Sequence, residues 1–256
     1  MLNRPRIIPV LSISNGDLVK TTKFRNPRYL GDPINAVKIF NGKYIDELCI
    51  LDIEASKKGR EPNFELLKDI ASQAFMPLSY GGGIRNIEQI KRLITIGYEK
   101  VIINSAFFEN PKLITEASNL LGSQSVVVSI DVKTSLLGKK QVFSASGVIK
   151  QSSSPEEYSL QAEKLGAGEI IISSIDKDGM MSGYDIELIK LVVDSVSVPV
   201  VALGGARDVK DLKSAIIDGN AHAVAASSMF IYYGKMKAVL ITTPTEQELR
   251  NNGIYK

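Results

Sequence analysis

The chain has 256 residues, of which 44% are hydrophobic and 23% are charged, which is typical of a globular protein with a sizeable core. Its net charge of +3 is mild, and no lysine and arginine run interleaved with aromatic residues indicates nucleic-acid binding. The single cysteine, Cys49, and the single histidine, His222, exclude an internal disulfide and argue against a zinc site or a catalytic Cys/His pair. Because the first apolar run is too short for a signal peptide or a membrane span, we expect a cytoplasmic protein without metal, other cofactor or membrane contact.

Eight short runs rich in β-branched residues predict strands along the chain. These runs are almost continuously apolar, as expected of parallel strands that are buried on both faces. In chain order the predicted strands are Arg6–Ser12, Glu47–Asp52, Met76–Tyr80, Val101–Asn104, Ser125–Asp131, Glu169–Ser173, Val198–Leu203 and Ala223–Ala226.

Amphipathic stretches between these strands predict helices, with proline near several starts and glycine after several ends. The predicted helices are Pro33–Phe40, Phe64–Ala74, Ile87–Ile96, Pro111–Leu120, Pro155–Leu165, Ile186–Val193 and Val209–Ile217. Eight strands that alternate with helices predict an α/β fold, a single (β/α)8 TIM barrel over residues 1–256. An open, doubly wound parallel sheet is the alternative.

An internal repeat favours the barrel. The stretch Gly82-Gly83-Ile84-Arg85-Asn86-Ile87 aligns with Gly204-Gly205-Ala206-Arg207-Asp208-Val209, and the similarity continues through the next helix and strand. Leu51-Asp52 likewise resembles Ile175-Asp176. The repeat predicts two half-barrels, roughly residues 1–122 and 123–233, followed by a tail over residues 234–256.

Three segments fall outside the regular alternation. Two long strand-to-helix connections, Ile13–Asp32 and Val132–Ser154, occupy equivalent places in the two halves, where lids and active sites of such barrels lie. In the tail, Lys237–Ile241 has an extended pattern and Pro244–Arg250 is predicted to form one short helix.

Glycine-rich turns after two pairs of strands are candidate phosphate sites. Glycine lets backbone N–H groups approach an anion closely, and a helix N-terminus adds favourable partial charge. The first candidate site contains Gly82, Asn104 and Ser105, and the second contains Gly205, Ala226 and Ser227. Tight turn geometry is the alternative explanation for either glycine pair. Two phosphate sites on one rim imply a substrate with a phosphate at each end.

Carboxylates near strand ends are candidate acids and bases. Asp131 closes a buried strand, where a carboxylate is costly without a role, although capping or ion pairing would also explain it. The repeat places Ser12 opposite Asp131, so only one member of a symmetric acid/base pair is present. Further candidates are Asp52, Asp176 and Asp178, predicted at strand ends, and Lys20 on the first long connection, which either reaches over the substrate or is a solvated loop lysine.

Charged residues also begin four of the predicted strands. Arg6, Glu47, Lys100 and Glu169 each precede an apolar stretch, which places them at the N-terminal end of the barrel. Two cations and two anions there predict either surface ion pairs or a ring that closes the barrel floor and gates passage through it.

With the repeat, the glycine turns and the charged residues in place, the chain resembles the cyclase (synthase) subunit of imidazole glycerol phosphate synthase from Arg6 to about Phe230. The motifs that carry the resemblance are Tyr80-Gly81-Gly82-Gly83-Ile84, the stretch from Gly122 to Asp131, Gly166-Ala167-Gly168-Glu169, Ser174-Ile175-Asp176-Lys177-Asp178-Gly179 and Ser182-Gly183-Tyr184-Asp185. The resemblance implies a barrel that pairs with a glutaminase subunit as a heterodimer. Ammonia from that partner passes along the barrel axis and closes an imidazole ring on a phosphorylated ribulosyl-aminoimidazole-carboxamide. The products are imidazole glycerol phosphate and aminoimidazole carboxamide ribonucleotide, in histidine biosynthesis.

The resemblance also implies roles for single residues. Asp131 matches one catalytic aspartate, Ser12 stands where the family has the other, and Lys20 matches a lysine of the first loop. One phosphate site would contain Gly82, Asn104 and Ser105, and the other Gly179, Gly205, Ala226 and Ser227. The ammonia gate would be Arg6, Glu47, Lys100 and Glu169, and Glu99 would face the glutaminase.

Ser12 and the first loop depart from the family pattern, and the tail does not match its last helix. These departures resemble paralogues of surface-polysaccharide (lipopolysaccharide) biosynthesis, which pass ammonia to a separate sugar-amidating enzyme. Both readings, a cyclase (lyase) and a non-cyclising ammonia-conducting partner, remain open. A third, the related phosphoribosyl-type sugar isomerase, needs no ammonia, and the retained gate residues argue against it.

Overall fold

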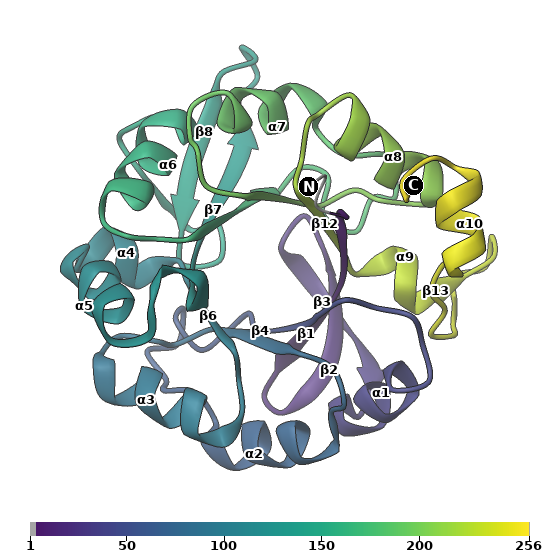
Figure 1. Cartoon of the computed structure of the whole chain (residues 1–256), viewed down its shortest axis with the longest axis horizontal. Coiled ribbons are helices and arrows are strands. Elements are labelled where there is room, and N and C mark those ends of the chain that lie inside the picture. The colour runs from purple at the N-terminus through teal and green to yellow at the C-terminus, as the bar shows by residue number, and fades with distance from the viewer. Residues whose placement is uncertain (1–3, 256) are drawn as a thin grey trace.

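A computed structural model describes residues 4–255 and shows a closed ring of parallel strands surrounded by helices (Figure 1). The strands of the ring are β1 (Arg6–Ser14), β4 (Leu48–Asp52), β5 (Leu78–Gly81), β6 (Lys100–Ile103), β7 (Val126–Thr134), β10 (Glu169–Ser174), β11 (Val200–Leu203) and β12 (Ala223–Ala226). Pairing of β12 with β1 and of β6 with β7 joins the two halves, and pairing of β7 with β10 completes the ring. The predicted (β/α)8 barrel is confirmed, and the open sheet is wrong.

The helices outside the ring follow the predicted pattern closely. They are α1 (Pro33–Phe40), α2 (Phe64–Gln73), α3 (Ile87–Ile96), α5 (Lys112–Leu121), α6 (Pro155–Lys164), α7 (Ile186–Val193) and α8 (Val209–Ile217). Local capping explains the agreement: Asn86 accepts a hydrogen bond from the Gln89 N–H at the start of α3, and Gly97 ends that helix in the left-handed region. Two short helices, α4 (Ser105–Glu109) and α9 (Ser228–Ile231), directly follow strands and were not predicted.

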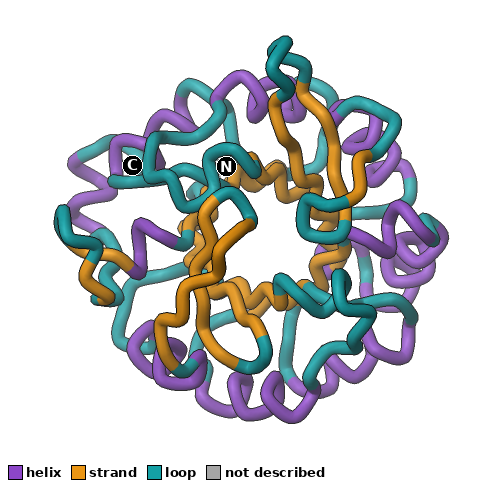
Figure 2. Tube along the Cα trace, turned by 180° about the vertical axis from the view of Figure 1, so that it is seen from behind, coloured by secondary structure: helices purple, strands orange, loops and turns teal. Residues whose placement is uncertain are grey.

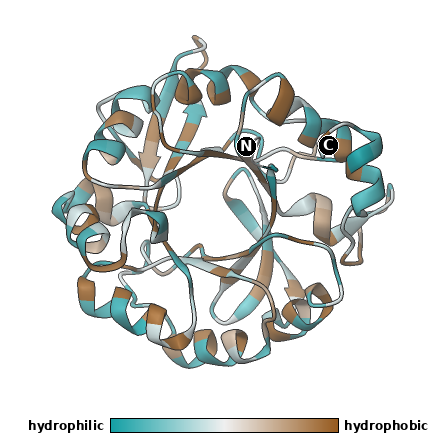
Figure 3. Cartoon of the chain, in the orientation of Figure 1, coloured by the Kyte–Doolittle hydropathy of each residue, from teal (hydrophilic) through white to brown (hydrophobic). Residues whose placement is uncertain are grey.

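The hydrophobic core has two layers. The larger layer lies between the strands and the helices, and the smaller one fills the inside of the barrel with residues such as Ile8, Val10, Val127 and Val201. Figure 3 shows hydrophobic residues along the ring and an alternation of hydrophobic and hydrophilic residues on the helices. Because each strand is buried on both faces, its sequence is continuously apolar.

Two antiparallel hairpins replace the predicted long connections on the C-terminal side of the barrel. β1 continues into β2 (Asp17–Thr22) and β3 (Arg25–Gly31), and β7 continues into β8 (Lys140–Ser144) and β9 (Ile149–Lys150). The turn between β1 and β2 is Asn15-Gly16, with positive φ at both residues, which is a frequent two-residue hairpin turn. The tube view shows both hairpins as extensions of the ring (Figure 2). The two connections lie where they were predicted, but the hairpins within them were not predicted.

The strand register corrects one part of the predicted repeat. Ser12 pairs with Leu51 of β4, and the corresponding residue Asp131 pairs with Ser173 of β10. Ser173-Ser174 is therefore the counterpart of Leu51-Asp52, whereas Asp176 lies two residues beyond the end of β10. Aligning Leu51-Asp52 with Ile175-Asp176 was wrong because it matched the aspartates rather than the pairing register. The division at about residue 122 stays a prediction.

The tail folds back onto the barrel. Strands β13 (Tyr232–Tyr233) and β14 (Ala238–Val239) pair, and the short helix α10 (Glu246–Asn251) begins with a capping box at Thr245. Leu249, Ile254 and Tyr255 are buried in the main core. Within residues 4–255, no helix combines the length and the hydropathy that crossing a membrane requires.

Candidate functional site

A pocket of about 410 Å3 opens at the C-terminal ends of the barrel strands. It brings together nine of the residues singled out in the sequence, namely Ser12, Lys20, Asp52, Gly82, Asn104, Ser105, Asp131, Asp178 and Ser227. Asp176, Gly179, Gly205 and Ala226 are not among its lining residues. The C-terminal end of the strands is where active sites of such barrels are built.

Asp131 is the buried acid of this pocket. It lies on β7. The side-chain amide of Asn104 donates a hydrogen bond to Oδ2 of Asp131 at 3.3 Å, and the hydroxyl of Ser129 lies 3.5 Å from Oδ1. The pKa of the Asp131 carboxyl is raised to about 7, chiefly by burial and in addition by the nearby charge of Asp178, while the hydrogen bond with Ser129 opposes the rise. A group with a pKa near neutrality exists in both protonation states, so Asp131 is suited to proton transfer.

Ser12 occupies the equivalent position on β1. It is buried, lines the same pocket and pairs with Leu51 as Asp131 pairs with Ser173. The pocket therefore has a carboxyl group on one side and a hydroxyl group at the related position. A serine hydroxyl does not accept or release a proton at neutral pH without a base, so the two sides are chemically unequal.

Lys20 is neither a solvated loop lysine nor a free group above the pocket. Its ammonium group contacts Asp178 at 2.5 Å, and its side chain is 4% exposed. The same carboxylate accepts from the hydroxyl of Thr21 at 2.7 Å and from the N–H of Phe24 at 3.2 Å. The β2–β3 hairpin is thus bound to the segment that follows β10. The position of Lys20 at the pocket agrees with the prediction, but its charge is already neutralised by Asp178.

The first candidate phosphate site borders the pocket. Asn104 donates to the backbone oxygen of Ser129 at 2.9 Å, and the hydroxyl of Ser105 accepts from the N–H of Ala145 at 3.3 Å. Gly82 has φ +128°, and a Cβ there would lie 2.5 Å from the backbone oxygen of Asp52, so the turn requires glycine. Tight packing alone is enough to explain a glycine at position 82. Because Gly82 also lines the pocket, phosphate binding there stays a proposal.

The second candidate site is packed more closely. A Cβ on Gly205 would lie 2.2 Å from the backbone oxygen of Gly183, and one on Gly179 would lie 2.3 Å from that of Thr21. Within the described chain the hydroxyl of Ser227 is buried without a hydrogen-bond partner, and Ser227 lines the pocket. An unpartnered buried hydroxyl is costly, so Ser227 is the member of this set best placed to meet a polar ligand.

The remaining aspartates serve the loops. Asp52 ends β4, and its Oδ1 accepts from the N–H groups of Glu54 and Ala55 at 3.0 and 2.9 Å. Asp176 accepts from the N–H of Thr134, which binds the β7–β8 hairpin to the segment after β10. Predicting Asp176 and Asp178 at a strand end was wrong, because β10 ends at Ser174.

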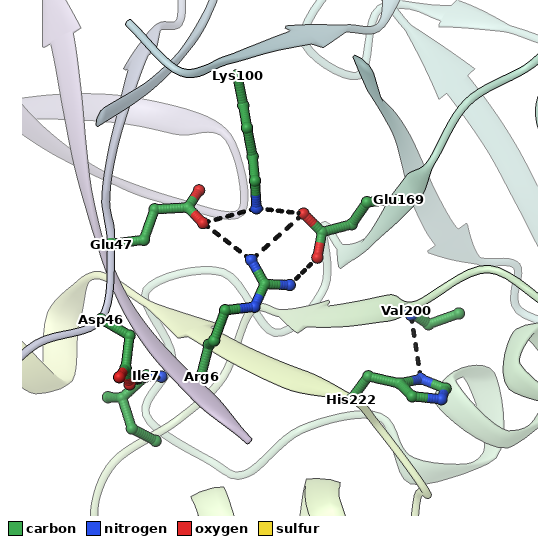
Figure 4. Close-up of polar contacts among 8 residues, drawn as sticks. All are labelled: Arg6, Ile7, Asp46, Glu47, Lys100, Glu169, Val200 and His222. Atoms are coloured by element: carbon green, nitrogen blue, oxygen red, sulfur yellow. Dashed lines mark hydrogen bonds and ion pairs between the residues drawn. The ribbon is translucent and has the colours of Figure 1, made fainter. Parts of the chain in front are cut away.

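Four charged residues form a closed ring at the opposite end of the barrel (Figure 4). Arg6 contacts Glu47 at 2.9 Å and also binds Glu169, and the Lys100 ammonium lies 2.8 Å from a carboxylate oxygen of each glutamate. The glutamate side chains are 8% and 7% exposed. Of the two readings of the sequence, a ring across the barrel floor agrees with these contacts and separate surface pairs do not. Glu99, next to this ring, is exposed on the same end.

The barrel interior connects this ring to the pocket through apolar residues. A small cavity of about 10 Å3 is lined by Glu47 and Glu169 of the ring and by Val10 and Leu203, which also reach the pocket. A cavity of this size holds about one water-sized molecule. Ammonia has a similar size, and its neutral form tolerates apolar surroundings.

Several pocket residues were missed in the sequence. Ser129 and Ser173 lie within apolar strands, and a polar residue at an inward position of such a strand was the available signal. Arg25, at the exposed start of β3, and Lys57, on an exposed turn, also line the pocket. No local pattern distinguishes such residues from ordinary surface charges.

Comparison with known proteins places this site in a family. Residues 6–237 match the family model described as "Histidine biosynthesis protein", which covers all the ring and pocket residues described above. The chain belongs to this family.

Relatives cover nearly the whole chain. "Putative imidazole glycerol phosphate synthase subunit HisF" of Leptospira interrogans is 49% identical over 96% of this chain and 97% of its own length. "Putative imidazole glycerol phosphate synthase subunit hisF3" of Vibrio vulnificus is 47% identical over 96% of this chain and 95% of its own length. "Imidazole glycerol phosphate synthase subunit HisF" of Alkaliphilus metalliredigens is 39% identical over 89% and 90%.

Proposed function

We propose that this chain is the ammonia-receiving synthase subunit of a glutamine amidotransferase. A glutaminase subunit docks on the N-terminal end of the barrel, near Glu99, and releases ammonia at the ring of Arg6, Glu47, Lys100 and Glu169. The observation that carries the proposal is the ring itself. It closes the N-terminal end of the barrel, and the apolar barrel interior lies between the ring and the pocket at the C-terminal end. The names of the relatives as subunits of imidazole glycerol phosphate synthase support the same assignment.

Ammonia enters through a rearrangement of the ring. Lys100 is the member with a flexible aliphatic side chain, and its ammonium group bridges both glutamates at 2.8 Å. Rotation of Lys100 away from the axis would leave Arg6 to neutralise the two carboxylates. The apolar interior beyond it offers few hydrogen bonds, which favours passage of neutral ammonia over retention of ammonium.

Two fates of the ammonia fit the pocket. In the first, Asp131 transfers protons while the ammonia closes an imidazole ring on a phosphorylated ribulosyl-aminoimidazole-carboxamide, and the phosphates bind near Gly82 and Ser227. The raised pKa of Asp131 supports this cyclase reaction. In the second, the chain does not cyclise and delivers ammonia to a separate sugar-amidating enzyme of surface-polysaccharide biosynthesis.

Ser12 favours the second fate. Ring closure requires protons to be taken up and released on both sides of the substrate, and the pocket offers a carboxyl group only at Asp131. The hydroxyl of Ser12 has no pKa near neutrality and cannot replace the second acid. We therefore propose the non-cyclising ammonia carrier as the function, with the cyclase as the second candidate.

Turnover of the ribulosyl carboxamide substrate with free ammonium chloride distinguishes the two. We expect no measurable turnover by the wild-type chain and recovery of turnover in Ser12→Asp, because the substitution restores the second carboxyl group. Ser12→Asn, which matches the aspartate in size but carries no acid, is the matched control and should recover nothing. Normal turnover by the wild-type chain would contradict the non-cyclising proposal and establish the cyclase.

A further inference from the structure

The pocket contains two cations without partners. Its charged lining residues are Lys20, Arg25, Asp52, Glu54, Lys57, Asp131 and Asp178. Most of them are already engaged, and Glu54, for example, accepts from Ser14 and from Lys58, both at 2.7 Å. Among residues 4–255, the side chains of Arg25 and Lys57 form no hydrogen bond or ion pair.

The two cations come from separate segments that are held in place. Arg25 begins β3, directly after Phe24, whose N–H donates to Asp178. Lys57 follows Ser56, whose hydroxyl accepts from the N–H of Gly83 at 3.1 Å. Both segments are therefore anchored to the pocket wall, and each carries its cation to the exposed edge of the pocket.

Two of the neighbouring acids, Glu54 and Asp178, are already paired with other cations. On the loop of Lys57, the acid Glu54 is satisfied by Lys58, with Arg60 at 3.8 Å. Near Arg25, the carboxylate of Asp178, in the segment after β10, is paired with Lys20 of the hairpin. An exposed unpaired cation costs little by itself, but two of them at the edge of one pocket, beside acids that are already paired, attract an anionic group of a ligand.

We propose that Arg25 and Lys57 form an anion subsite at the pocket mouth that binds a phosphate monoester of the ligand. Arg25 supplies the planar donor pair that suits phosphate oxygens, and Lys57 supplies a compact positive charge. This subsite is additional to the glycine turns, in which the donors belong to the backbone. The inference rests on the proposed function, because it assumes that the pocket that receives the ammonia also binds a phosphorylated ligand.

Binding of ribose 5-phosphate, with ribose as the neutral comparison, tests the subsite. Titration calorimetry on the full chain should show binding of the phosphate ester, and Arg25→Gln combined with Lys57→Gln should weaken it at least tenfold. Lys23→Gln combined with Lys68→Gln is the matched control, because it removes the same net charge from exposed positions that do not line the pocket. The control should change the affinity less than twofold.

Chemical modification supplies a second measurement. Ribose 5-phosphate should slow the modification of Arg25 by phenylglyoxal, followed by mass spectrometry, whereas ribose should not. Equal loss of affinity in the two double variants, or modification of Arg25 at the same rate with and without the phosphate ester, would overturn the subsite. Neither measurement uses ammonia or a glutaminase, so the subsite and the proposed function can fail independently.

Discussion

Replacing Lys100 with methionine tests how strongly the charged ring is coupled. Lys100 contacts Glu47 and Glu169 at 2.8 Å, and both carboxylates are at least nine-tenths buried. Loss of one partner from a buried ion pair costs about 3–5 kcal/mol, because the remaining charge is left uncompensated. Arg6 still contacts both glutamates in the variant, so we expect the lower end of that range, about 3 kcal/mol.

The expected change is large enough to measure by thermal unfolding. In a chain of this size each kcal/mol lowers Tm by about 2–4 °C, so Lys100→Met should unfold roughly 6–12 °C below the wild type. Lys91→Met is the control, because Lys91 pairs with Glu88 at 2.8 Å on the exposed surface of α3, where a pair contributes about 0–1 kcal/mol. Adding Glu47→Gln to Lys100→Met should recover part of the loss. Equal Tm values for the Lys100 and Lys91 variants would refute the reasoning.

Three further predictions concern single residues. The Asp131 carboxyl keeps its proton up to about pH 7 when folded but loses it near pH 4 when unfolded, so its contribution to stability falls as the pH rises between these values. Asp131→Asn should therefore gain stability relative to the wild type between pH 4.5 and pH 8 in urea unfolding, by roughly 3 kcal/mol, and a constant difference would contradict the raised pKa. Gly205→Ala should lower the free energy of unfolding by at least about 2 kcal/mol more than Gly16→Ala does in the same assay. The new Cβ at position 205 would meet the backbone oxygen of Gly183, whereas there is open space around Gly16. Similar losses in the two variants would argue against the tight turn. Leu249→Ala should cost about 2–5 kcal/mol if the tail is part of the core, and a loss below about 1 kcal/mol would show that it is not.

The barrel was predictable because its elements are locally encoded. Strands buried on both faces are continuously apolar, and helices such as α1 and α3 carry their own caps at Asp32 and Asn86. The hairpins were missed because these segments were assumed to be loops, although an Asn-Gly pair such as Asn15-Gly16 is typical of a two-residue hairpin turn. Periodicity therefore identified the scaffold but not the extensions that cover the site.

The arrangement of the pocket was less predictable. Lys20 and Asp178 are 158 residues apart, and their contact depends on how the β2–β3 hairpin crosses the rim, which no local pattern encodes. The register that pairs Ser173 with Asp131 likewise emerges only from strand pairing. The contrast between Ser12 and Asp131, by comparison, was predictable from the repeat. Aligning the two halves shows that an aspartate in the second half corresponds to a serine in the first.

The central claim is that a glutaminase subunit delivers ammonia to this barrel through the ring. The most direct measurement is glutamine hydrolysis by the purified glutaminase subunit, alone and with the wild-type chain, together with the stoichiometry of their complex by sedimentation. We expect a one-to-one complex and faster hydrolysis when the chain is present. Absence of a complex, together with an unchanged rate of hydrolysis, would contradict the account.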